Sequence, residues 1–392
     1  MPDTDCPAGI SEEESCMSWL LRVLLLVAVV SVIGWSAESR AGTEGAIKIA
    51  GIFSLSGQAE APNRSVVMGV QIAVDEINAS GGILGRRLEL LLIDNESTPI
   101  GSMVAAQKAV ADKVVAIIGA SWSSHSLAIA PVAQEHHIPM ISPFSSIPKL
   151  TAIGNFIFRV CYTDDFQGEM LAKYAFNDLK ARRSVIFVDL TSDYSMELAR
   201  YFREQFQALG GTVEREIEYK SNQINYDLQI ARAAAARGDV IVLTGYDESG
   251  FIAAKLQQAG IKAKLLGGDG WGEGDFYSLG GNRLHSAYFL THWTKESENP
   301  FSQRFVAEYG KREGLAAGTA LGYDAVNVLA EAIRQAGSSD RDDIRQALAK
   351  GVYSKGVTGS ISFDGQGDPV KNILVVEIRD GVPFYLKTLY PH

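Results

Sequence analysis

The sequence predicts an α/β protein with two doubly wound parallel-sheet lobes, joined by a hinge that the chain crosses several times. The first observation is that strand-like and helix-like segments alternate along most of the 392 residues, with short loops between them. The second is that two of the strand-like segments, residues 114–118 and 240–243, are almost continuously apolar. Strands of this kind are buried on both faces, as in parallel sheets covered by crossover helices.

The first run of alternating segments begins with a β-rich stretch at residues 47–53. A broad apolar stripe with helical spacing then extends from Val66 to Ile77, and Ser80-Gly81-Gly82 provides a typical helix stop. The remaining segments of this run are predicted strands at 88–93, 114–118 and 139–142 and predicted helices at 102–111 and 124–135.

The alternation pauses near residues 155–165 and then resumes, which indicates a second lobe, since the two runs are too long to share one core. After Asp164 the predicted order is helix to 179, strand 185–188, helix 196–209, strand 213–219, helix 226–237, strand 240–243, helix 249–259 and strand 264–266. From residue 301 the order changes to helices at 301–309, 321–336 and 342–349, followed by strands at 360–363, 373–378 and 385–389.

No low-complexity linker separates the two runs, so we expect a hinge rather than a flexible tether. We assign residues 46–162 with 293–370 to lobe 1, and residues 163–292 with 371–392 to lobe 2.

The first 41 residues have the character of an export signal. An apolar run from Leu20 to Gly34 is followed by small residues that suit cleavage after Ala37 or Ala41. These 15 residues, at about 1.5 Å each, are shorter than a hydrocarbon core of ~30 Å. We therefore expect a cleaved signal peptide at 1–41, with an uncleaved membrane anchor as the alternative. The residues before the run are unusually acidic, and Met17 would give a more conventional start.

Charge and cysteine content exclude some functions. With 36 basic and 46 acidic side chains the net charge is −10, which argues against a nucleic-acid partner. Cys6 and Cys16 lie in the predicted signal peptide, so the exported chain has only Cys161 and cannot form an internal disulfide. We interpret Cys161 as a small buried hydrophobic residue.

Catalytic signatures are missing from the sequence. It contains no G-x-S-x-G, no G-x-x-x-x-G-K-[ST] and no H-E-x-x-H pattern. The glycine-rich run at 267–274 lacks the third glycine that a dinucleotide-binding loop needs. We expect no enzymatic activity, no metal and no cofactor.

Two serine-rich loops follow strands of the first lobe, where open α/β sheets bind ligands. Residues 119–126 contain Ser121, Trp122 and Ser123 before a predicted helix, whose free N–H groups and positive dipole end suit a carboxylate. Plain N-capping is the alternative, although capping needs only one serine. The second loop contains Phe144, Ser145 and Ser146 between two prolines, and its serines are either ligand-binding or simple turn residues.

Polar and aromatic residues also follow strands of the second lobe. Asp269, flanked by glycines, is either a turn residue or an acceptor for an ammonium group that faces the serine loops. Tyr194 and Tyr246 would form apolar walls that carry a hydroxyl, with partial burial at the surface as the alternative.

With these residues identified, the chain resembles the periplasmic solute-binding proteins for branched-chain amino acids (Leu/Ile/Val). These are type I periplasmic binding proteins, of the "Venus flytrap" kind, that serve ABC importers. The resemblance covers about residues 46–390. It is carried by Ile52-Phe53-Ser54-Leu55-Ser56-Gly57, Ala73-Val74-Asp75-Glu76-Ile77-Asn78-Ala79-Ser80-Gly81-Gly82-Ile83-Leu84-Gly85, Ile141-Ser142-Pro143, Tyr323-Asp324-Ala325 and Phe363-Asp364-Gly365-Gln366-Gly367.

The resemblance implies a periplasmic, monomeric protein that closes around an amino acid and is recognised by ABC permease membrane subunits. In the family, the serine loop and the hydroxyl after the proline hold the α-carboxylate, and an acid of the second lobe holds the α-ammonium. The matching ligand-binding positions are Ser121, Trp122, Ser123, Phe144 (through its carbonyl), Ser146, Tyr194, Tyr246 and Asp269.

Four features depart from the family pattern. Trp122 and Phe144 replace small residues, the loop Gln58-Ala59-Glu60-Ala61-Pro62 lacks an aromatic residue, and Gly318 falls near a position where an aromatic side chain is expected. These changes predict a side-chain pocket with more bulk on one side and less on another. The ligand is therefore expected to be a branched-chain or other hydrophobic amino acid, with aromatic or aliphatic carboxylates, amides or urea as alternatives. A ligand-sensing receptor ectodomain is a further alternative.

Overall fold

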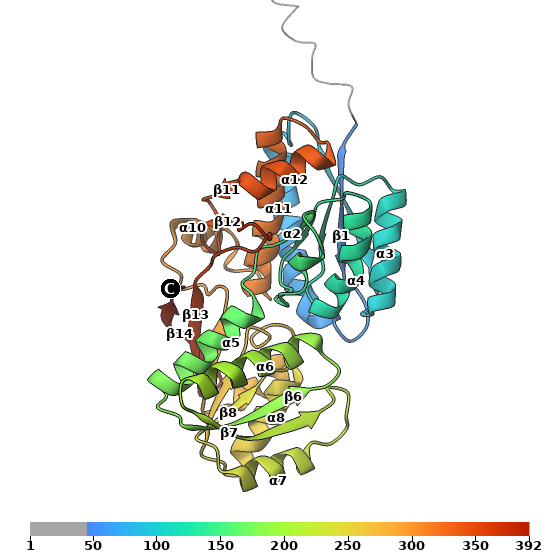
Figure 1. Ribbon diagram of the computed structural model, residues 1–392. Helices are drawn as coiled ribbons and strands as arrows, with labels where there is room; N and C mark the ends of the chain where they lie inside the picture. The colour runs from blue at the N-terminus through green and yellow to red at the C-terminus, as the bar shows by residue number, and fades with distance from the viewer. Residues whose placement is uncertain (1–44, 392) are drawn as a thin grey trace, which may run out of the picture. The chain divides into compact units, whose positions relative to one another are not determined.

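The structure, a computed structural model, is described for residues 45–391, and the predicted signal peptide lies outside this range. From Ala46 onward the chain forms one compact unit, built on two large sheets (Figure 1). Within the described range, no helix combines the length and hydropathy needed to cross a membrane.

The first sheet has five parallel strands in the order β2-β1-β3-β4-β5. The strands are β1 (Ile47–Phe53), β2 (Leu88–Asp94), β3 (Ala116–Gly119), β4 (Met140–Ser142) and β5 (Ile157–Arg159). The order reverses between β1 and β3, since β2 lies on one side of β1 and the later strands lie on the other. Such a reversal opens a crevice at the carboxyl ends of the strands, where ligands bind in doubly wound folds.

Helices cover both faces of the first sheet (Figure 1). On one face, α3 (Pro99–Ala111) and α4 (Ser123–Glu135) bury Ala106 and Ile129 against Ile52 of β1. The other face is covered by α2 (Glu60–Ala79), α11 (Ala317–Ala336) and α12 (Arg341–Lys350). The near-continuous apolar composition of β1 and β3 agrees with this coverage, because every residue of the two strands except Lys48 is buried.

The second sheet has seven strands in the order β14-β13-β10-β9-β8-β6-β7. Its strands are β6 (Arg183–Asp189), β7 (Thr212–Tyr219), β8 (Val240–Leu243), β9 (Lys264–Gly267), β10 (Ser286–Thr291), β13 (Ile373–Arg379) and β14 (Val382–Leu389). The strands from β7 to β10 are parallel, as predicted. The two C-terminal strands add an antiparallel edge, since β13 runs opposite to β10 and a tight turn at Asp380-Gly381 reverses the chain into β14.

Helices also cover both faces of the second sheet. α5 (Asp164–Lys173), extended by a π-helical turn at Tyr174–Asp178, and α6 (Asp193–Ala208) pack on one face. α7 (Asp227–Ala236) and α8 (Glu248–Gln258) pack on the other, and the short α9 (Phe276–Leu279) follows the glycine-rich loop.

The chain passes between the two sheets three times: after β5, after β10 and after the small hairpin of β11 (Val352–Tyr353) and β12 (Ile361–Ser362). The middle excursion also contains α10 (Pro300–Tyr309). The crossing segments contact one another. Tyr162 stacks on His292 with ring centroids 3.7 Å apart, and the Lys371 ammonium donates a hydrogen bond to the Val160 carbonyl at 3.0 Å. The predicted fold class with a multi-crossover hinge is therefore confirmed, while the residue boundaries of the lobes stay a prediction.

Three strands are not predicted by the sequence patterns. β5 and β11 are only three and two residues long, too short for a periodic pattern. β10 follows the irregular stretch after the glycine-rich loop. Helix α2 begins at Glu60, well before the apolar stripe that starts at Val66. The apolar pattern missed its first turns because they bury Asn63 and Ser65 rather than large apolar side chains.

Candidate functional site

The first serine loop lies at the switch between β1 and β3. Gly119 ends β3 with φ +140°, and a Cβ on this residue would lie 2.3 Å from the Ile52 carbonyl oxygen, so only glycine allows the loop to leave the sheet here. Helix α4 then begins at Ser123 with Trp122 as its N-cap residue and with no side-chain cap hydrogen bond. N-capping by a serine is therefore the wrong explanation for this loop. The His125 and Ser126 N–H groups donate to the Trp122 carbonyl, so the N–H groups of Ser123 and Ser124 and the positive dipole end are the parts of this turn that suit an anionic group.

Three serine hydroxyls hold the two loops together. Ser126 Oγ accepts a hydrogen bond from the Ala120 N–H at 3.0 Å and lies 2.6 Å from Ser145 Oγ. Ser142 Oγ donates to the Ala120 carbonyl at 2.8 Å and accepts from the Ser145 N–H at 3.0 Å. Ser145 is therefore a turn residue, which was the alternative explanation for the serines of the second loop.

The other predicted serines, Ser121, Ser123 and Ser146, are buried. Ser121 Oγ has no hydrogen-bond partner among the residues that the structure describes. The Ser146 carbonyl accepts a hydrogen bond from the Asp164 N–H at 2.9 Å, which joins the second loop to the start of α5.

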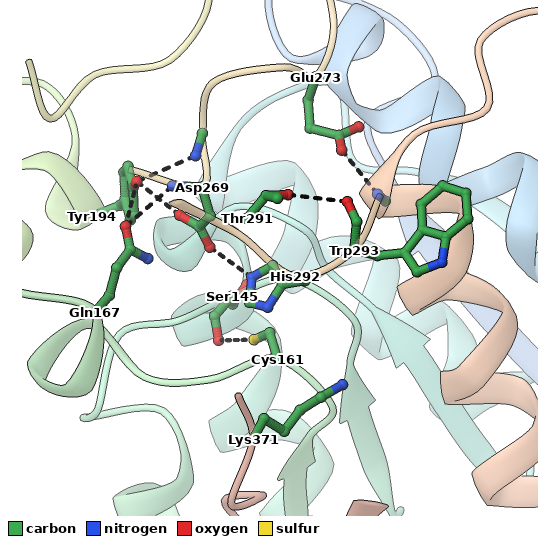
Figure 2. Close-up of polar contacts among 12 residues, drawn as sticks. Ser145, Cys161, Gln167, Tyr194, Asp269, Glu273, Thr291, His292, Trp293 and Lys371 are labelled. Atoms are coloured by element: carbon green, nitrogen blue, oxygen red, sulfur yellow. Dashed lines mark hydrogen bonds and ion pairs between the residues drawn. The ribbon is translucent and has the colours of Figure 1, made fainter. Parts of the chain in front are cut away.

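Asp269 follows β9 and is almost fully buried, at 1% exposure. Figure 2 shows its carboxylate between two donors: the Tyr194 hydroxyl donates to Oδ1 at 2.8 Å, and His292 Nε2 lies 2.8 Å from Oδ2. The Asp269 N–H donates to Gln167 Oε1 at 3.1 Å. A Cβ on Gly268 would lie 2.4 Å from the Tyr194 hydroxyl, so the glycine before Asp269 lets the tyrosine reach the carboxylate.

Stacked aromatic rings connect Asp269 to the serine loop of the other lobe. Trp122 stacks on Tyr246 with centroids 4.7 Å apart, and Tyr246 stacks on Tyr194 at 4.9 Å. Phe144 meets the His292 ring edge-on at 5.1 Å. The structure thus brings the predicted positions into one region through direct contacts or shared loops: Ser121, Trp122, Ser123, Phe144, Ser146, Tyr194, Tyr246 and Asp269.

Four further residues of this region are not predicted by sequence reasoning: Tyr162, Asp164, Gln167 and His292. Among the described residues, no hydrogen-bond partner is found for the Tyr162 hydroxyl, both Asp164 carboxyl oxygens, Gln167 Nε2 and His292 Nδ1, all of which are buried. Buried polar atoms normally have partners. A cluster of such atoms is therefore a candidate place for a polar ligand.

Burial controls the protonation of this cluster. It raises the pKa of the Asp164 carboxyl well above its ordinary value, and the nearby Asp269 charge adds to this effect, while the Arg159 charge opposes it. Burial lowers the pKa of His292, while its hydrogen bond to Asp269 opposes that shift.

The one sequence feature that could have identified Asp164 and Gln167 as site residues is their position directly after the first crossing between the sheets.

The family model described as "Periplasmic binding protein" matches residues 46–382. The chain belongs to the periplasmic binding protein family. This periplasmic binding protein is 30% identical over 326 residues to the Leu/Ile/Val-binding protein BraC3 of Rhizobium johnstonii, covering 82% of the chain and 88% of that relative.

Solved structures agree with this assignment. The leucine-binding protein LivK of Thermotoga maritima matches with a TM-score of 0.84 and 36% identity, covering 88% of this chain and 99% of that chain. LivJ of Streptococcus pneumoniae, solved with isoleucine, matches with a TM-score of 0.83 and 28% identity, covering 88% and 100%. The predicted family and fold are confirmed.

The surroundings of Gly318 involve a side chain of the second lobe, Glu273. The Glu273 carboxylate accepts hydrogen bonds from Ser65 Oγ at 2.7 Å and from the Gly318 N–H at 2.9 Å, both in the first lobe. Burial raises the pKa of Glu273 to about 7.

A cavity of about 460 Å³ adjoins Glu273 and is lined by Trp271, Trp293 and Leu315 among others, but by none of the predicted ligand-binding residues. Within residues 45–391, no group of three or more histidine, cysteine, aspartate or glutamate side chains has a geometry that could hold a metal ion. The candidate site of this periplasmic binding protein is therefore the cluster around Asp269 and the serine loop.

Proposed function

We propose that this protein captures a hydrophobic α-amino acid between its two lobes in the periplasm and presents it to the membrane subunits of an ABC importer. Lobe 1 is taken as residues 46–162 with 293–370 and lobe 2 as residues 163–292 with 371–392. The observation that carries the proposal is the pairing of two opposite binding surfaces. The serine loop at the start of α4 faces Asp269 through the stacked rings of Trp122 and Tyr246. The Leu/Ile/Val-binding relatives support the same ligand class.

The two ends of a zwitterion have different requirements, and the site offers both. The N–H groups of the first turn of α4, with the hydroxyls of Ser123 and Ser146, suit the α-carboxylate. Asp269 suits the α-ammonium, and each charge-assisted hydrogen bond would contribute about 1.5–3 kcal/mol. Tyr194, Tyr246 and Trp122 would cover the side chain of the ligand.

Closure would follow from contacts that only the closed arrangement makes. The Trp122–Tyr246 stack and the hydrogen bonds of Glu273 to Ser65 and Gly318 all join one lobe to the other. A ligand that bridges the serine loop and Asp269 adds to these contacts, so it shifts the open–closed equilibrium towards the closed form.

The test is calorimetric titration of the exported chain with L-leucine, L-isoleucine, L-valine and L-phenylalanine. Asp269→Asn should weaken binding of the preferred amino acid by about 10- to 150-fold, as expected for the loss of one charge-assisted hydrogen bond. Asp275→Asn, which changes an exposed acid a few residues further along the same loop, is the matched control and should leave affinity unchanged. A loss of less than about threefold in Asp269→Asn would mean that Asp269 does not hold an ammonium.

A second candidate function is the binding of an aromatic or aliphatic carboxylate without an ammonium group. It is favoured by the hydrogen bonds of Asp269, since both of its oxygens already accept from Tyr194 and His292. In the same titration, isocaproate or hydrocinnamate would then bind more tightly than leucine or phenylalanine, their amino-acid counterparts.

A further inference from the structure

His292 occupies an unusual place in this site. It directly follows β10, on the second crossing between the lobes, and is 3% exposed. Its Nε2 lies 2.8 Å from Asp269 Oδ2, one face of its ring stacks on Tyr162 at 3.7 Å, and Phe144 meets it edge-on (Figure 2 shows the contact with Asp269). These contacts fix the ring against the carboxylate that the proposed function assigns to the ligand ammonium.

The charge of the Asp269–His292 pair depends on one proton. A carboxylate oxygen only accepts hydrogen bonds, so Nε2 carries a proton in this contact whether the ring is neutral or charged. With neutral His292 the pair carries one negative charge, and with imidazolium it carries none. A carboxylate has about four lone-pair sites, so Asp269 can still accept from a ligand ammonium beside Tyr194 and His292.

Resting on the proposed binding of an amino acid, we propose that His292 is a specificity-determining residue that selects the charge class of the ligand. Neutral His292 leaves Asp269 as an anion and favours a zwitterionic amino acid. Protonated His292 neutralises Asp269 and favours a ligand that carries only a carboxylate. The same site would thus discriminate between the two candidate ligand classes according to the protonation of one imidazole.

The groups around the ring decide where this proton binds. Asp269 favours the imidazolium, whereas burial and the Lys371 ammonium on the third crossing disfavour it. Tyr162 also stacks on the ring, and Asp164, whose charge interacts with that of Asp269, has a pKa that burial raises well above its ordinary value. Because burial dominates, the pKa of His292 is lowered from its ordinary value of 6.5. At neutral pH the site therefore has a neutral His292 and favours a zwitterionic amino acid.

The experiment measures affinities for two matched pairs of probes, L-leucine with isocaproate and L-phenylalanine with hydrocinnamate, from about pH 7.5 to about pH 5. Each pair differs in structure only by the ammonium group, and each affinity is calculated from the concentration of the ionised carboxylate form of the probe. Glu273 also titrates in this range, but it would affect closure on both members of a pair, so the readout is the ratio of the two affinities. Below the His292 pKa, the ratio of the affinity for the amino acid to the affinity for the matched carboxylate should fall by about tenfold for each pH unit.

His292→Gln should abolish this pH dependence of the ratio. His285→Gln is the matched control, because His285 is an exposed histidine at the start of the same strand and pairs with Asp380. It should keep the full pH dependence. A ratio that changes equally with pH in His292→Gln would assign the effect to Asp164 and overturn the proposal, as would a constant ratio in the unchanged protein.

A second measurement needs no variant of His292 and separates this inference from the proposed function. The imidazole signals of the unchanged chain are titrated by NMR with and without probe. Bound leucine should lower the His292 pKa and bound isocaproate should raise it, because linkage is reciprocal. If none of the four probes binds, the proposed function fails, and the inference is then decided in the free protein. There, Asp269→Asn should lower the His292 pKa, and an unchanged His292 pKa would overturn the inference.

Discussion

Trp122 lies flat on Tyr246, with ring centroids 4.7 Å apart and ring planes 4° from parallel. Trp122 belongs to the serine loop of the first lobe, and Tyr246 follows β8 of the second. Tyr246 in turn stacks on Tyr194, whose hydroxyl holds Asp269. The contact that joins the lobes is therefore part of the same group of side chains that we propose to bind the ligand.

Trp122→Ala should weaken binding of the preferred ligand by at least about 2- to 13-fold, because an aromatic stack contributes about 0.5–1.5 kcal/mol beyond the apolar area that it buries. Trp122→Phe, which keeps a ring in the same place, should lose less. Both values come from calorimetric titration. Equal losses in the two variants would show that the ring stack does not stabilise the closed form.

Glu273→Gln should remove one component of the pH dependence of stability. The pKa of Glu273 is raised from 4.5 to about 7 by burial. Its contribution to stability is therefore fully present below about pH 4.5 and is lost as the pH rises through about 7. Urea unfolding of the unchanged chain should show this fall in the free energy of unfolding, and Glu273→Gln should lack it. Glu296→Gln, an exposed neighbour on the second crossing, is the control and should keep the fall.

Gly318→Ala should destabilise the closed form. A Cβ on this residue would lie 2.4 Å from Ser65 Oγ and 3.0 Å from Glu273 Oε2, so the two partners that meet across the lobes would have to move. We expect a loss of about 1–3 kcal/mol in the free energy of unfolding. Gly365→Ala is the matched control, because nothing lies within 4 Å of its added Cβ. A similar loss in both variants would contradict the proposed crowding at Gly318.

Lys371→Met should change stability at alkaline pH. Burial lowers the pKa of Lys371 from 10.5 to about 8. The contribution of the lysine to stability is therefore present above about pH 10.5 and is lost as the pH falls through about 8. The free energy of unfolding of the unchanged chain, minus that of Lys371→Met, should rise over this interval. The exposed Lys355→Met serves as control, and a flat difference for Lys371→Met would refute the prediction.

Much of the fold could be predicted because the apolar pattern and the burial agree. The bounds of β1 and β8 match the predicted strands, since every residue of the continuous run Val240–Leu243, for example, is buried. The serine loops and Asp269 could be located because each follows a strand that the pattern predicts. The two rings of Tyr194 and Tyr246 were found for the same reason.

Three of the residues that escaped prediction, Tyr162, Asp164 and His292, follow strands that also escaped it. His292 directly follows β10, and without that strand nothing in the sequence indicates that the histidine lies at the carboxyl end of the sheet. Tyr162 and Asp164 lie on a crossing whose path is set by contacts with distant segments, such as the hydrogen bond between Val160 and Lys371. Glu273 depends on Ser65 and Gly318, which are far from it in the sequence. Local patterns carry no information about such pairs.

The three passages between the sheets also bear on how this chain could be divided experimentally. α2 packs against α11, which belongs to the middle excursion, so a fragment that ends after β5 would expose the apolar face of α2 to water. No single cut can release either half as a continuous peptide. A protease that nicks one passage should leave a complex held together by the other two, and the halves would have to be reassembled from several pieces to be studied apart.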